Sequence, residues 1–210
     1  MKNAIFAPAM LVEDANGIHQ LNSKSLMLKN RVIFLDTEID EDVVHETIRQ
    51  LILLGQQGTG PVTVILDTPG GSIKAGFQLI DVLESCPFPI RTVALGCAAS
   101  MGAIILAAGT KGQRFVSKRS KVMIHEPLLA GGISCSTSQI ETVANDLIAT
   151  RETINEMLCA YTGKDMITMR NATCYDHYFT ADEAVGFGLA DAIAEDEVLF
   201  AYLSGGEVNA

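Results

Sequence analysis

Short apolar runs alternate with amphipathic segments of helical period along this chain, and that alternation limits its fold more than any other feature. The run Val62–Leu66 (VTVIL) is continuously apolar, as expected of a strand covered on both faces. The preceding segment, 40–54, places four apolar residues on one helical face: Val44, Ile48, Leu51 and Ile52. Strands that alternate with helices predict parallel β-α-β units with helices packed on the sheet.

The same pattern continues through most of the chain. It predicts strands near 31–35, 90–95 and 121–125, helices near 73–83 and 101–108, a helix capped by Thr180 and Glu183, and a closing strand-like run in LADAI. With 210 residues, we expect a single α/β domain over 1–210. Residues 1–25 read as a flexible or loop-forming N-terminal segment.

A second prediction concerns one unusually long helix, from Ser138 to Tyr161, with Gly163 as its stop. Ser138 and Glu141 have the spacing of a capping box. The apolar residues recur at three, four or seven positions: Ile140, Val143, Leu147, Ile154, Leu158 and Tyr161. Such a helix either projects and buries its stripe against another subunit, or packs on its own domain.

Composition bounds the function classes. The chain is 48% hydrophobic and only 19% charged, which favours either an oligomer or a large core. A net charge of −10 argues against nucleic-acid binding, and no apolar stretch reaches the roughly 18 residues that span a bilayer. The five cysteines are scattered without metal-ligand spacing, so we expect reduced thiols in the cytoplasm and no metal or cofactor.

Ser100 lies where a β-type run meets a helix, in LGCAASMGAIIL. Such a serine often only caps the helix by accepting a backbone hydrogen bond. Alternatively, the turn exposes the hydroxyl as a nucleophile, and the helix N-terminus stabilises negative charge. Gly70 and Gly71 follow a buried strand in LDTPGGSIKAG; they form either a plain tight turn or a backbone oxyanion hole.

His125 ends the run KVMIH, and Asp176 lies in CYDHYF just ahead of a capped helix. Each has an ordinary structural interpretation, as a strand-end histidine and a loop aspartate. As a general base, His125 needs an acid to orient it and a nucleophile within about 3 Å. His177, beside Asp176, is a weaker competitor for the base, and His45 and His19 lie on a polar helix face and in the N-terminal segment.

Several motifs together resemble the family of the proteolytic subunit of the Clp protease (ClpP). They are LKNRVIFL, the Pro-Gly-Gly strand exit at 69–71, GCAASMGA around Ser100, TKGQRF at 110–115, MIHEP at 123–127 and DHYFTADEAVGFGLADAI at 176–193. These motifs occur in order over nearly the whole chain, from about residue 10 to about residue 195.

The resemblance implies a crotonase-like α/β fold and a handle formed by 128–163, whose long helix stacks seven-membered rings in pairs. It implies Ser100 as nucleophile, His125 as base and Asp176 as its orienter, with oxyanion donors at the N–H groups of Gly71 and Met101. It also implies that Gly70 and the segment Gly131–Gly132 bind substrate, the segment as an added strand. The expected substrate is unfolded polypeptide, the expected assembly a homo-oligomeric double heptameric ring, and the expected partner an AAA+ Clp unfoldase.

Four positions depart from this family. The Gln after the histidine is Glu126 here, and the usual Arg before the aspartate, which helps to link the two rings, is Tyr175. Aromatic positions on the strand before Pro-Gly-Gly, part of the surface pocket that grips the ATPase, are Thr63 and Ile65, whereas Phe115 keeps its match.

Three alternatives remain. A crotonase-type hydratase would keep the backbone oxyanion donors but has no reason for the Ser, His, Asp order. A signal-peptide peptidase uses a Ser-Lys dyad and a membrane segment. A structural or regulatory ring subunit paired with an active paralogue would lose triad members, and this chain retains all three.

Overall fold

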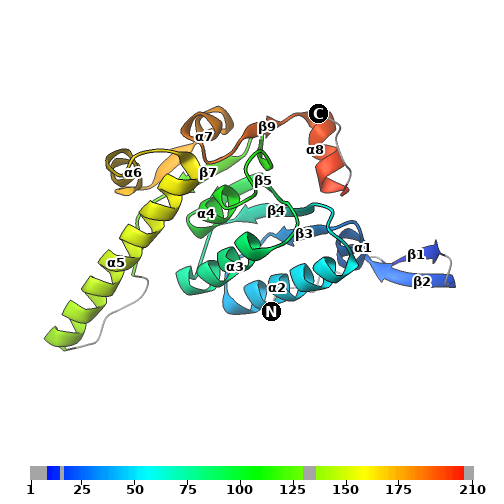
Figure 1. The fold of residues 1–210 in the computed structure, drawn as a ribbon, viewed down its shortest axis with the longest axis horizontal. Helices are drawn as coiled ribbons and strands as arrows, with labels where there is room; N and C mark the ends of the chain where they lie inside the picture. Colours follow the sequence, from blue (N-terminus) through cyan, green and yellow to red (C-terminus); the bar gives the residue numbers. More distant parts are fainter. Residues whose placement is uncertain (1–8, 15–16, 130–135, 206–210) are drawn as a thin grey trace.

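The computed structural model describes residues 9–14, 17–129 and 136–205, and Figure 1 shows their arrangement. The elements in chain order are β1 (Ala9–Asp14), β2 (Gly17–Asn22), α1 (Ser23–Lys29), β3 (Val32–Leu35), α2 (Glu41–Gln57), β4 (Val62–Thr68), α3 (Ile73–Ser85), β5 (Ile90–Ala99), α4 (Met101–Ala107), β6 (Arg114–Ser117), β7 (Lys121–Ile124), α5 (Thr137–Thr162), α6 (Met166–Thr173), β8 (His177–Phe179), α7 (Ala181–Phe187), β9 (Ala192–Ala194) and α8 (Asp196–Leu203).

Within the described residues, seven strands form one sheet whose main path is β3-β4-β5-β6-β9. All pairs along this path are parallel, so the predicted β-α-β architecture is confirmed. The long strand β5 pairs first with β6, at Thr92–Ala94, and then with β7, at Cys97–Ala99. Strand β8 pairs antiparallel to β7 and completes the sheet.

Both faces of this sheet are covered, which explains the continuous apolar run in β4. Val64 and Leu66 belong to the main core with helices α2, α3, α4 and α5, whereas Ile65 belongs to a second cluster that contains Tyr202 of α8. Figure 1 shows α2 and α3 on one side of the sheet and α8 on the other. None of the helices in the described part of the chain is long and apolar enough to cross a membrane.

Helix α5 is long, as expected, and Figure 1 shows its N-terminal end projecting beyond the body of the domain. The predicted stop is confirmed, since Gly163 adopts φ 75° at the C-cap. The predicted N-terminal box was wrong by two residues: the box consists of Ser136 and Gln139. Gln139 Oε1 accepts from the Ser136 N–H at 2.7 Å, so a glutamine fills the role assigned to the glutamate at 141. The box at Thr180 and Glu183 is confirmed.

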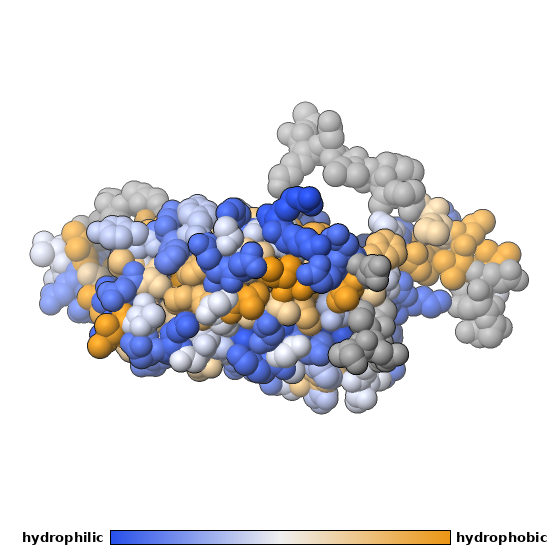
Figure 2. All heavy atoms as spheres, turned by 90° about the horizontal axis from the view of Figure 1, so that it is seen from above, coloured by the Kyte–Doolittle hydropathy of each residue, from blue (hydrophilic) through white to orange (hydrophobic). Residues whose placement is uncertain are grey.

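Two other expectations need correction. Ile52 is exposed, because α2 buries a face that includes Thr47 and Gln50, whose side chains form hydrogen bonds within the helix. The described part of the N-terminal segment is not a loop: β1 and β2 form an antiparallel hairpin that α1 follows. Figure 2 shows apolar atoms on the surface at this end of the molecule, where Met10, Leu11 and Ile18 are exposed.

Candidate active site

Ser100 lies between β5 and α4 in a backbone conformation that side chains seldom adopt. Its φ is 55° and its ψ −120°, in the region of positive φ that favours glycine, and its N–H donates to the Met123 carbonyl at 2.8 Å. Residues held this way are strained and cluster at functional sites. The side chain makes no capping hydrogen bond to α4, so the helix-cap interpretation fails. The turn leaves the hydroxyl free for another partner.

That partner is His125, the residue after the end of β7. Its Nε2 lies 2.9 Å from Ser100 Oγ, and its side chain is only 13% exposed. Parallel pairing of β5 with β7 aligns Ala99 with Met123, which brings the two strand ends together. The backbone register therefore sets the distance between the hydroxyl and the imidazole.

Asp176 completes the row from the loop before β8. Its Oδ1 lies 3.1 Å from His125 Nδ1, on the far side of the imidazole from Ser100. The antiparallel pairing of β7 with β8 aligns Ile124 with His177, so His125 and Asp176 are the next residues on facing strands. A hydroxyl, an imidazole and a carboxylate in this order form the arrangement that activates a serine nucleophile.

The competing histidines do not join this row. The ring of His177 stacks on Phe179 with centroids 4.2 Å apart, and His45 is exposed on α2. The side chain of His19 lies outside the described residues. Of the histidines that can be compared, His125 is the one bonded to both a serine and an aspartate.

Gly70 and Gly71 form a turn that lies directly against the serine. Their φ values are 96° and 153°, and a Cβ on Gly70 would lie 2.7 Å from the Ser100 Cβ. A Cβ on Gly71 would collide with the Ile39 backbone, which pairs with this turn: the Ile39 N–H donates to the Gly70 carbonyl at 2.8 Å. Only glycine fits at both positions, because the backbone approaches so closely.

The N–H groups of Gly71 and Met101 are free to bind a ligand. Neither donates a hydrogen bond to another group within the described part of the chain, and both residues line a cavity of about 460 Å³ together with Ser100 and His125. The first N–H groups of a helix have no partner inside the helix, which applies to Met101. Two unpaired N–H donors next to a hydroxyl can stabilise an oxyanion.

The rest of the cavity is mostly apolar, with two carboxylates. The apolar side chains come from three helices and two loops or strand ends: Ile73, Ile104, Ile124, Pro127, Leu128, Ile154 and Leu158. The carboxylates belong to Glu38 and Glu126. Such a lining suits an apolar group of a ligand.

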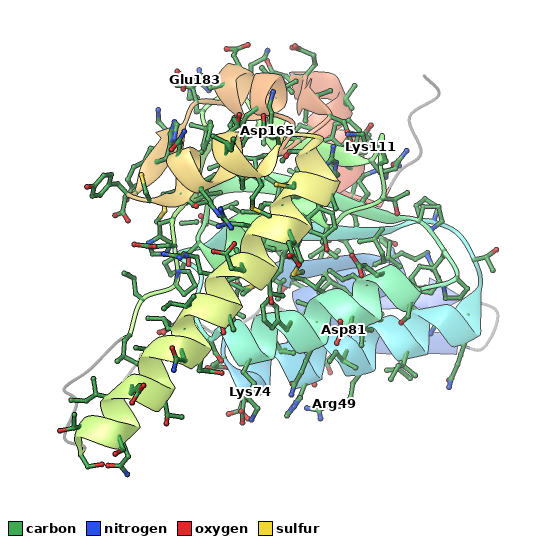
Figure 3. All side chains as sticks on the ribbon, turned by 60° about the vertical axis from the view of Figure 1, so that its left-hand side comes forward. Arg49, Lys74, Asp81, Lys111, Asp165 and Glu183 are labelled. Carbon is green, nitrogen blue, oxygen red and sulfur yellow. The ribbon has the colours of Figure 1, made fainter. Side chains whose placement is uncertain are left out.

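A chain of ion pairs, which the sequence analysis did not find, runs from this cavity to α6 (Figure 3 shows the region around α5). Arg151 Nη1 lies 3.4 Å from Glu126 Oε2, and Arg151 Nη2 lies 3.4 Å from Glu152 Oε1. Arg170 binds the other oxygen of Glu152, and this hydrogen bond is the main cause that lowers the pKa of Glu152. Arg151 and Glu152 are adjacent in the sequence, but their partners Glu126 and Arg170 lie far along the chain, so no local pattern contains these pairs.

The remaining site predictions have mixed outcomes. Gly131 and Gly132 lie outside the described residues, so the added-strand prediction stays a prediction. Tyr175 is 82% exposed beside Asp176. Thr63 and Ile65, the departures from the family's aromatic surface positions, are each 1% exposed, and Tyr202 of α8 lies in the same cluster as Ile65.

The family model described as Clp protease matches residues 15–197, a span that holds every element from β3 to β9 and the whole Ser100–His125–Asp176 row.

Proposed function

Since this chain belongs to the Clp protease family, we propose that it is a serine endopeptidase that cuts unfolded polypeptides to short peptides. The observation that carries the proposal is the row of hydrogen bonds from Ser100 through His125 to Asp176, at the edge of an apolar cavity. We propose Ser100 as nucleophile, His125 as general base and Asp176 as the group that orients the imidazole. No cofactor is needed for this chemistry.

The proposed reaction has two halves. Ser100 Oγ forms a bond to the carbonyl carbon while His125 Nε2 takes its proton, and the carbonyl electron pair moves to the oxygen, which the N–H groups of Gly71 and Met101 bind. Collapse of this intermediate breaks the C–N bond, and His125 gives the proton to the leaving amine. Water then attacks the acyl ester in the same way and restores the hydroxyl.

The substrate assignment follows from the cavity and the family. The apolar lining favours an apolar side chain at the residue before the cut, because its burial there removes apolar surface from water. Gly70 and, by family resemblance, the Gly131–Gly132 segment are proposed to bind substrate backbone. Family membership also supports a double-ring homo-oligomer fed by an AAA+ Clp unfoldase, in the cytoplasm, where the four described cysteines, all unpaired, would stay reduced.

The deciding experiment is Ser100→Ala, assayed with a short internally quenched peptide and a fluorophosphonate probe. We expect the unmodified chain to cleave the peptide and bind the probe, and the variant to lose about 10⁶ in turnover and all labelling. Ser85→Ala, which removes an exposed hydroxyl on α3, is the matched control and should keep both signals. A chain that assembles but neither cleaves nor labels would instead be a structural or regulatory subunit paired with an active paralogue.

A further inference from the structure

The charges that line the cavity are all of one sign. Glu38, in the loop before α2, and Glu126, directly after His125, contribute carboxylates, and no Lys or Arg is among the described lining residues. The two glutamates come from segments far apart in the sequence. A substrate in this cavity therefore meets negative charge from two separate parts of the fold.

The two lining carboxylates differ in how far cations offset their charge. Arg151 lies 3.4 Å from both Glu126 and Glu152, and Arg170 pairs with Glu152 as well, so these two arginines balance the two glutamates. Lys74, labelled in Figure 3, binds Glu41 at 2.9 Å. Glu38 has no ion pair within the part of the chain that the structure describes, and the whole chain carries −10. Glu38 is therefore the lining carboxylate whose charge no described cation opposes, whereas Arg151 offsets the charge of Glu126 while leaving its carboxylate at the cavity.

We propose that Glu38 and Glu126 determine specificity by selecting substrates with a basic side chain beside the cut and rejecting those with an acidic one. This inference rests on the proposed peptidase function, and it narrows the substrate class to segments that combine an apolar residue with a neighbouring Lys or Arg. A basic side chain gains an attractive interaction at the edge of the cavity, whereas an acidic one is desolvated next to like charge. Discrimination then comes as much from rejection as from attraction.

The test uses three internally quenched peptides that share one apolar residue before the cut and differ only beside it, with Lys, Gln or Glu. We expect kcat/KM to fall in that order, by about tenfold from Lys to Glu at low ionic strength, and the difference to shrink as salt is added. Glu38→Gln and Glu126→Gln, each isosteric and uncharged, should reduce the ratio of kcat/KM between the Lys peptide and the Glu peptide. The double variant should bring this ratio close to one. Because the Gln peptide is the internal reference, a general change in activity cancels.

Asp81→Asn is the matched control. Asp81 is exposed on α3 (Figure 3) and does not line the cavity. Its substitution removes the same charge elsewhere, so the ratio of kcat/KM between the Lys and Glu peptides should not change. Equal rates for the three peptides in the unmodified chain, or an undiminished ratio in the double variant, would overturn the inference.

A binding measurement separates this inference from the proposed function. The Ser100→Ala variant is titrated with the same peptides by fluorescence anisotropy, a readout that needs no hydrolysis. Tighter binding of the Lys peptide, lost in the double glutamine variant, supports the charge selection even if the unmodified chain cleaves nothing. Cleavage of the Gln peptide that depends on Ser100, without any charge preference in rate or binding, leaves the peptidase intact and removes the selection.

Discussion

In the C-terminal half of α5, Ile154 and Leu158 are buried against the domain, whereas in the N-terminal half Ile140 and Ile148 are each 51% exposed. Both halves carry apolar side chains at helical spacing, and one continuous helix holds them. The two readings that the sequence left open, projection and packing on the same domain, therefore each apply to one half. The comparison teaches that an amphipathic pattern predicts that a helix has an apolar stripe, and the neighbouring elements decide where that stripe is buried.

The largest effect should come from removing Asp191, the partner of the arginine that anchors the C-terminal end of α5. Arg114, 1% exposed, donates to the Tyr161 carbonyl near the end of α5 and pairs with Asp191 at 2.6 Å. Burial raises the pKa of Asp191, but hydrogen bonds from Arg114 outweigh it, so the pKa is lowered and the carboxylate is charged. Asp191→Asn should cost about 3–5 kcal/mol in the free energy of unfolding, because it leaves a buried guanidinium without its partner charge.

The matched control for this anchor is Asp196→Asn. It removes an aspartate that pairs with Lys118 at the surface, so its cost in chemical denaturation should be no more than about 1 kcal/mol. Equal losses in the two variants would show that the Arg114 pair is not an anchor.

A smaller effect should separate the two halves directly. Leu158→Ala opens a cavity in the core and should lower the free energy of unfolding by about 2–5 kcal/mol. Ile148→Ala, in the exposed N-terminal half of α5 (the free half), should change the free energy of unfolding by no more than about 0.5 kcal/mol when measured on dissociated chains in urea. If Ile148→Ala proved as costly as Leu158→Ala, the free half would be packed within its own domain after all.

The free half should matter more for assembly than for the fold. The double variant Ile140→Asn and Ile148→Asn removes its exposed apolar side chains, so sedimentation should shift from a large species to smaller ones while circular dichroism stays unchanged. Ile167→Asn, on α6 and 74% exposed, tests whether any exposed isoleucine has this effect, and it should not. An unchanged sedimentation profile in the double variant would place the subunit contacts elsewhere.

The smallest effect concerns pH. The pKa of Glu152 is lowered from 4.5, first by the hydrogen bond from Arg170, so its stabilising contribution is present above 4.5 and is lost as pH falls through the lowered value. Glu152→Gln should therefore be less stable than the unmodified chain near neutral pH, with the difference closing in acid. If the stability deficit of Glu152→Gln were the same at every pH, the ion pair with Arg170 would not be its cause.

Much of the central fold could be predicted because its signals are local. The apolar run of β4 and the strand exits at Gly70, Ser100 and His125 can be recognised within a few residues. Strand β8 could not be predicted: it has three residues, too few for a period, and no turn motif marks it, yet it fixes Asp176. The burial of Ile65 depends on Tyr202, far along the chain, and no local pattern contains that contact.

The end-to-end alignment of β5, β7 and β8 has a consequence for how this chain tolerates change. The three side chains meet because the register of β7 with β5 and with β8 places the ends of these strands next to one another. Substitutions that keep the buried side chains of those strands packed leave this alignment unchanged. One residue inserted or deleted between Lys121 and Ile124 shifts the register of β7 and turns the side chains that follow in the strand to the opposite face. The length of these strands, and not only their composition, therefore decides whether the three side chains meet.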